Sequence, residues 1–127
     1  MTATVEFRVR IRDLTGGAEE GIVEEIKGFL SLDEANEFAR RYVRDSVERC
    51  RAPGLSPREV VEAWFVFGED AEVLEAAVDV AIGAADPIDS ENGGWSSEGE
   101  VAFFAEEPAM AEERDWRALD PRRRPRE

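Results

Sequence analysis

The sequence predicts an α+β fold: a small, mainly antiparallel sheet with a long amphipathic helix, about residues 31–51, packed on one face and one or two further helices. Two observations support this class. Apolar and charged residues alternate near the N-terminus, as in a hairpin, and a capped helical pattern follows. The length of 127 residues fits one domain, which we assign to residues 1–120.

The N-terminal segment has the alternation of a strand with one buried face. Its apolar residues are Val5, Phe7, Val9 and Ile11, and charged residues stand between them. The stretch from Asp13 to Gly21 contains Gly16-Gly17 and predicts a turn. A second strand is expected at about 22–30, where Gly28 indicates a bulge or a close backbone approach.

Three arginines, Arg8, Arg10 and Arg12, occupy the outer face of the first strand. They could form a track for phosphates or nucleic acid, or ion pairs with Glu24 or Glu25 on the neighbouring strand. We favour the ion pairs, because a strongly acidic chain repels polyanions and no aromatic residues are interleaved on that face.

The segment 31–51 is the best-specified element of the chain. Ser31 and Glu34 have the spacing of a capping box, and Pro53-Gly54 ends the helix. Its apolar stripe consists of Ala35, Phe38, Ala39, Tyr42, Val43, Val47 and Cys50. For Cys50 we favour core packing over a reactive thiolate, because the dipole at a helix C-terminus disfavours the thiolate.

The next element begins at Ser56-Pro57-Arg58-Glu59, a second capping box with proline at the first helical position. We expect a short helical turn at 57–61 and then a strand at 62–67, because Trp64-Phe65-Val66-Phe67 is strand-like. These aromatic residues are expected in the core or at a subunit interface; an exposed patch for a partner is the alternative.

The segment 71–85 is predicted to be a helix. Asp70 is a candidate cap, apolar residues recur every four positions, and six alanines favour a helix. A strand at 77–82 is the alternative, and Asp86-Pro87 ends the element in either case.

The C-terminal part predicts short helical pieces. Ser97 is expected to cap a helix at about 98–106, and 112–119 to form a helical turn with Trp116 as its packing anchor. Residues 121–127 form an arginine-rich tail that has nothing to bury and is expected to be disordered.

Composition excludes several kinds of active site. The chain has no histidine and one cysteine. This rules out Ser-His-Asp and Cys-His arrangements, histidine-based metal sites and multi-cysteine zinc or iron–sulfur sites within one chain. We lean against an enzyme. The lone cysteine, with neither a signal peptide nor a long apolar run, leads us to expect a cytoplasmic protein without membrane contacts.

The net charge of −14 is unevenly distributed. Residues 59–113 contain sixteen acids and no Lys or Arg. Arg40, Arg41 and Arg44 precede this segment on the helix at 31–51, and we predict that they bind the acidic segment or a partner. The tail Arg122–Arg126 of a neighbouring chain is a second source of positive charge.

The loop at 86–100 resembles a cation-binding loop in part. Asp89, Glu91 and Glu100 are the candidate ligands, with Asp86 beside them, and calcium or magnesium is the candidate cation. The pattern departs from a calcium loop because Gly93 supplies no side-chain ligand. A solvated acidic loop is the alternative, and we otherwise expect no cofactor.

Three function hypotheses follow from these observations. We expect a non-enzymatic protein-interaction or regulatory module, which associates with itself or with a protein that has a basic surface. The alternatives are a carboxylate-based divalent-cation-binding domain or small enzyme, and an acidic mimic of nucleic acid. The charge disfavours direct binding to nucleic acid, and it also fits adaptation for solubility or high salt.

Overall fold

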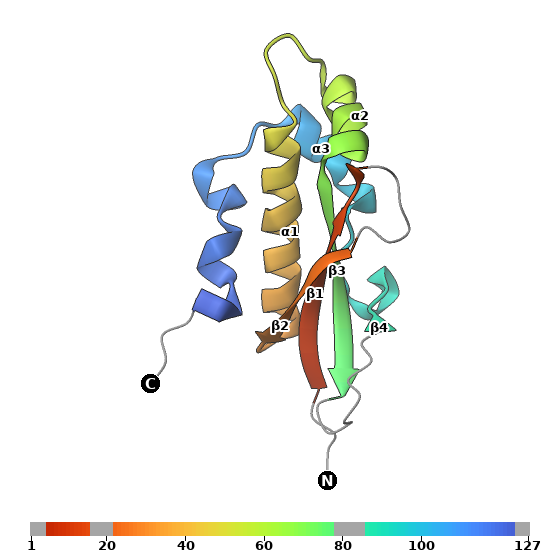
Figure 1. Cartoon of the computed structure of the whole chain (residues 1–127), viewed down its shortest axis with the longest axis vertical. Helices are drawn as coiled ribbons and strands as arrows, with labels where there is room; N and C mark the ends of the chain where they lie inside the picture. Colours follow the sequence, from red (N-terminus) through yellow and green to blue (C-terminus); the bar gives the residue numbers. More distant parts are fainter. Residues whose placement is uncertain (1–4, 16–21, 78–85, 124–127) are drawn as a thin grey trace.

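The computed structural model describes residues 5–15, 22–77 and 86–123. Within them, a four-stranded antiparallel sheet has the order β2-β1-β3-β4, and three α-helices accompany it. The strands are β1 (Val5–Asp13), β2 (Ile22–Phe29), β3 (Glu69–Ala77) and β4 (Asp86–Pro87). The helices are α1 (Leu32–Arg49), α2 (Pro57–Phe67) and α3 (Val101–Glu106). The long helix α1 packs against one face of the sheet (Figure 1), which confirms the predicted α+β fold.

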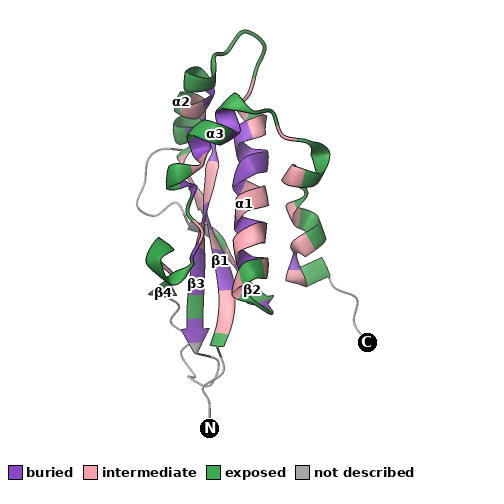
Figure 2. Ribbon diagram, turned by 180° about the vertical axis from the view of Figure 1, so that it is seen from behind, coloured by how far each residue is buried: buried purple, intermediate pink, exposed green. Residues whose placement is uncertain are grey.

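The alternation of β1 separates the two faces of the sheet as predicted. Val9 and Ile11 are fully buried in the core shared with α1. Figure 2 colours stretches of both β1 and α1 as buried. The arginines lie on the opposite face. β1 is the central partner, because β2 pairs with one of its edges and β3 pairs with the other along nine residues.

The predicted bulge in β2 is confirmed. The register between β1 and β2 shifts between the pairs Phe7–Phe29 and Val9–Ile26, so β2 has one extra residue there. Gly28 lies in the bulge with φ of +96°, a conformation that strongly favours glycine. The bulge keeps both Ile26 and Phe29 directed into the core.

The helix α1 packs as predicted and begins with the predicted Ser31 cap. The Ser31 hydroxyl accepts a hydrogen bond from the Glu34 backbone N–H at 3.1 Å. The buried stripe contains Ala35, Phe38, Ala39, Val43 and Val47, while Tyr42 and Cys50 are partly buried beside it. Arg44 and Asp45 are also buried, because C-terminal segments cover a second side of α1 (Figure 1). Ser46 is buried where its hydroxyl accepts a hydrogen bond from the Glu69 backbone N–H.

The prediction of a strand at 62–67 is wrong, because α2 continues as a helix to Phe67. The capping box between Ser56 and Glu59 is present in both directions, so the backbone N–H groups of Ser56 and Glu59 both have hydrogen-bond acceptors. Val60 and Trp64 lie one turn apart and are both buried. This spacing explains how an aromatic, strand-like sequence is stabilised as a helix with one buried side.

The prediction of a helix starting at 71 is also wrong. Residues 69–77 form β3, and its pairing with β1 aligns Val73 with Val9 and Ala71 with Ile11. The intrinsic helix preference of alanine contributes little free energy. The continuous pairing with β1 and the burial of β3 side chains contribute more, so the segment is a strand. The rest of the predicted helix, residues 78–85, lies outside the described residues, as does most of the alternative strand at 77–82.

The C-terminal part is helical in short pieces. Ser96, rather than Ser97, caps a 3-10 turn at Ser97–Gly99, and α3 follows from Val101. Further 3-10 turns occupy Ala111–Arg114, Trp116–Leu119 and Pro121–Arg123. Trp116 contacts Tyr42 and Phe38 of α1, which confirms its role as a packing anchor.

The turn at Pro121–Arg123 corrects the expectation of disorder for that part of the tail, because Arg122 is held by ion pairs with Asp120 and Glu24. Residues 124–127 lie outside the described residues. No helix in the described part of the chain is long and apolar enough to cross a membrane.

Candidate interaction surface

A groove lies between α2 and α3 at one end of the molecule. It has a volume of about 420 Å³ and is lined by Pro57, Arg58, Val61, Glu62, Phe65, Ala102 and Glu106. Helical spacing produces it, because positions 57, 61 and 65 recur every four residues along α2, and 102 and 106 do so on α3. The apolar part of the lining consists of Pro57, Val61, Phe65 and Ala102, and its charged groups belong to Arg58, Glu62 and Glu106.

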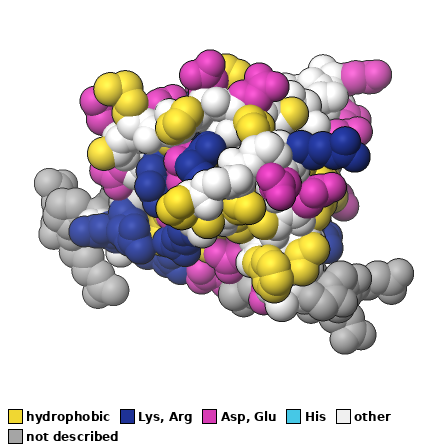
Figure 3. Space-filling model, turned by 90° about the horizontal axis from the view of Figure 1, so that it is seen from above, with side chains coloured by type: hydrophobic (Ala, Val, Ile, Leu, Met, Phe, Trp, Pro, Cys, Tyr) yellow, Lys and Arg dark blue, Asp and Glu magenta, His cyan; other side chains and the backbone are white. Residues whose placement is uncertain are grey.

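Large apolar side chains are exposed around this end of the molecule. Phe65 is 61% exposed, Phe67 70% and Phe103 50%. Figure 3 views this end and shows apolar side chains at the surface among acidic ones. Of the aromatic residues at 64–67, only Trp64 lies in the core, as expected. Phe65 and Phe67 are exposed, which was the alternative to burial.

The charge around the groove is mainly negative. Glu62 and Glu106 line it, and Glu59 is exposed in the first turn of α2. Arg58 is the single cation of the lining, and its Nε lies 3.8 Å from the Glu62 carboxylate. Both partners of this pair are well exposed, so it contributes little to stability.

The helix arginines predicted to bind a partner contact the chain's own C-terminal part. Arg40 Nε donates to Glu100 at 3.1 Å, and Arg41 Nη1 donates to the Asp115 carbonyl at 3.1 Å. Arg44 is only 2% exposed and donates to the Glu107 carbonyl at 3.0 Å. The predicted contact between α1 and the acidic segment therefore exists within one chain; binding of another protein by these arginines stays a prediction.

The carboxylate of Asp45, next to Arg44 near the C-terminal end of α1, also binds the C-terminal part of the chain. It accepts hydrogen bonds from Arg114 Nε at 2.8 Å and from Trp116 Nε1 at 3.3 Å, and pairs with Arg49 at 2.9 Å. Nothing in the sequence pattern indicates this role, because Asp45 is a single acidic residue beside the apolar stripe of the helix.

Cys50 lines a second cavity, of about 550 Å³, together with Phe67 and Glu69. It packs against the core, as expected. Burial raises the pKa of its thiol, which opposes thiolate formation at neutral pH. The geometry thus favours packing over nucleophilic chemistry at this position.

The candidate cation ligands lie around the loop at 86–100. Asp89 caps the 3-10 turn Ser90–Asn92 through its side chain, and Glu91 is exposed in that turn. Glu100 is occupied by its ion pair with Arg40. The described residues contain no group of three or more His, Cys, Asp or Glu side chains placed to hold a metal ion.

A broad cavity of about 930 Å³ separates this loop from β3. Five carboxylates line it together with Trp95: Asp70, Glu72, Asp89, Glu98 and Glu100. Burial raises the pKa of Asp70, although hydrogen bonds from Ser97 and the Ala71 backbone favour its charged form. The sequence pattern predicts Asp70 as a helix cap, and this cavity could not be predicted from it.

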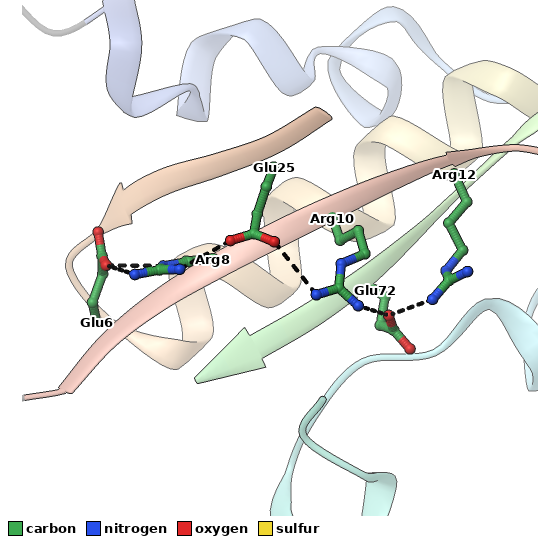
Figure 4. Close-up of polar contacts among 6 residues, drawn as sticks. All are labelled: Glu6, Arg8, Arg10, Arg12, Glu25 and Glu72. Atoms are coloured by element: carbon green, nitrogen blue, oxygen red, sulfur yellow. Dashed lines mark hydrogen bonds and ion pairs between the residues drawn. The ribbon is translucent and has the colours of Figure 1, made fainter. Parts of the chain in front are cut away.

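The outer face of the sheet carries a ladder of alternating charges (Figure 4). Glu25 bridges Arg8 and Arg10, at 3.0 and 3.4 Å, which confirms the predicted cross-strand ion pairs. The ladder extends to Glu6 beside Arg8, and Glu72 bridges Arg10 and Arg12 at 3.4 Å each. Burial opposes the charge of Arg8, but its hydrogen bonds to the glutamates outweigh this effect and raise its pKa.

The carboxylates of the acidic segment 59–113 do not share one surface. Glu72 belongs to the ladder on the sheet face opposite α1, whereas Glu100 pairs with Arg40 of α1, and Glu62 is exposed on α2. A mimic of nucleic acid needs its acids along one face. This arrangement gives the mimic hypothesis no support.

Comparison of the chain with models of protein families, with curated proteins and with solved structures finds no match.

Proposed function

We propose that the chain is a non-enzymatic protein-interaction module, and that the α2–α3 groove binds an amphipathic helix with basic residues from another protein. The observation that carries the proposal is the groove itself: an apolar floor open to solvent, with Glu62 and Glu106 among the residues that line it.

The apolar floor supplies the affinity. Phe65 is 61% exposed beside Val61 and Ala102, so a partner side chain that enters the groove removes aromatic and aliphatic surface from water. Recognition of an amphipathic helix uses such a groove, with anchors spaced one helical turn apart. Aromatic anchors of this kind commonly dominate the energetics of an interface.

The charge supplies the selectivity. Residues 59–113 contain no Lys or Arg, so the single cation of the lining, Arg58, comes from outside that segment. A helix with Lys or Arg flanking its apolar side is attracted to this surface, and an acidic helix is repelled. A second copy of the chain would bring the same acidic groove, which favours a basic partner over pairing of two grooves.

A pair of model peptides tests the proposal. Both are amphipathic helices with leucines at i, i+3, i+4 and i+7; one has lysine at the remaining positions and the other has glutamate. Calorimetric titration should show binding of the basic peptide, weakened about 10-fold by Phe65→Ala, which corresponds to about 1.4 kcal/mol. The acidic peptide should not bind.

Phe67→Ala is the matched control, because Phe67 is at least as exposed as Phe65 but lines the cavity near Cys50 instead of the groove. It should leave the affinity for the basic peptide within about two-fold. Binding that is equally strong in the Phe65→Ala variant would be non-specific attraction to an acidic protein and would contradict the proposal. So would a concentration-dependent increase in mass that Phe65→Ala abolishes, because the groove would then hold a second copy.

A further inference from the structure

The C-terminal turn Pro121–Arg123 lies against β2 at two positions of that strand, Gly28 and Glu24. A Cβ built on Gly28 would lie 3.5 Å from Pro121 Cβ. Arg122 Nη1 lies 2.8 Å from a carboxylate oxygen of Glu24. Asp120, which is 5% exposed, holds the same arginine through Nε at 2.9 Å and Nη2 at 2.7 Å.

The strand that this turn contacts is the last strand of the sheet. β2 stands at the end of the strand order, so no strand of the described part of the chain lies beyond it. Such a strand presents backbone donors and acceptors that can pair with another chain, and proteins commonly protect it with a bulge or a covering segment. Here the bulge at Gly28 and the turn at Pro121–Arg123 are both present.

We infer that β2 is a second interaction surface, that its partner is β2 of a second copy of the chain, and that the Pro121–Arg123 turn hinders this pairing in the monomer. The inference is independent of the α2–α3 groove, because it uses a different edge of the molecule and a different occupant. Two copies that pair through β2 associate without bringing their acidic α2–α3 grooves together.

The sequence of β2 is complementary to itself in one antiparallel register. When two copies pair about a two-fold axis at Ile26, Glu25 of each copy lies opposite Lys27 of the other. Lys27 is exposed and forms no ion pair with any described residue, so it is available for this contact. Opposite charges directly across an antiparallel pair are stabilising, and the isologous contact closes as a dimer.

Two truncations test the role of the turn. The variant lacking residues 124–127 retains Pro121–Arg123, and the variant lacking 121–127 removes it. Light scattering over a range of concentrations, in about 0.15 M salt to limit repulsion between acidic chains, gives the mass of each. The shorter variant should dimerise with an association constant at least about 10-fold above that of the variant lacking 124–127. Equal association constants for the two would overturn the inference.

Substitutions identify the surface used. In the chain lacking 121–127, Lys27→Glu places like charges opposite Glu25 and should reverse the dimerisation, whereas Lys27→Arg should preserve it. A dimer that survives Lys27→Glu uses another surface and would overturn the inference. Arg122→Glu in the full chain repels Glu24 without shortening the chain and should also promote the dimer, which keeps the test decisive if the shortened chain unfolds.

Discussion

The buried guanidinium of Arg44 stacks over the ring of Phe104, 4.7 Å from the ring centroid, and so joins α1 to α3. Its Nη2 donates to the Glu107 carbonyl, but its Nε and Nη1 atoms are buried without a hydrogen-bond partner among the residues that the structure describes. The aromatic face and the nearby Glu113, 3.5 Å away, are what offset the cost of burying this cation.

Arg44→Ala should lower the free energy of unfolding by about 2 kcal/mol or more, because it removes the cation–π contact and leaves a cavity under α3. Arg44→Met keeps most of the volume and removes the unsatisfied donors, so its cost should be less than half of that. Urea unfolding of both variants measures the difference. Equal losses in the two would show that packing around Arg44 is unimportant.

Gly94→Ala should be strongly destabilising, by about 3 kcal/mol or more, because an added Cβ would collide with the backbone carbonyl of Ile88. Gly99→Ala, in the same loop, is the control: a Cβ there meets nothing within 4 Å, and its effect should stay within about 0.5 kcal/mol. Thermal unfolding monitored by circular dichroism compares them. A small effect at Gly94 would mean that the loop can move away from Ile88.

Glu25→Gln should cost about 1 kcal/mol of stability, because Glu25 bridges Arg8 and Arg10 and both guanidiniums are largely buried. Glu75→Gln is a suitable control, since Glu75 is exposed on β3 and outside the ladder. Chemical denaturation at low and high salt provides the measurement. If the two variants lost stability equally, the ladder would contribute nothing beyond ordinary surface charge.

Asp70→Asn should stabilise the protein at neutral pH. Because burial raises the pKa of Asp70, the unfolded chain releases this proton at a lower pH than the folded chain does. Stability from this group is therefore highest below the unfolded pKa of about 3.9 and falls as pH rises through the folded pKa. The gain from Asp70→Asn should be present at pH 7 and shrink toward pH 3.5; a gain independent of pH would contradict this assignment.

The elements that could be predicted are those specified by nearby residues. The strand β1 and the helix α1 follow from a period of two and from a cap with a helical stripe, and both signals act over one segment. The ion pairs of Glu25 could be predicted for the same reason, because the adjacent strands of a hairpin bring known positions together.

The elements that were predicted wrongly depend on distant partners. β3 is a strand because β1, more than fifty residues earlier, pairs with it, and its alanines alone favour a helix. The groove requires α2 and α3 to meet, which no local pattern encodes. For the same reason the sequence identified Phe65 as aromatic but could not place it at the surface beside Ala102.

The charge ladder on the outer sheet face joins three arginines to three glutamates, so these six residues carry no net charge and the surplus of −14 lies elsewhere in the chain. Salt screens charges that are separated by more than about 8 Å much more than partly buried pairs in contact. Added salt should therefore weaken the repulsion among the surplus carboxylates while it leaves the ladder nearly intact. We therefore expect the domain to gain stability as ionic strength rises, although much of its outer sheet face is built from ion pairs.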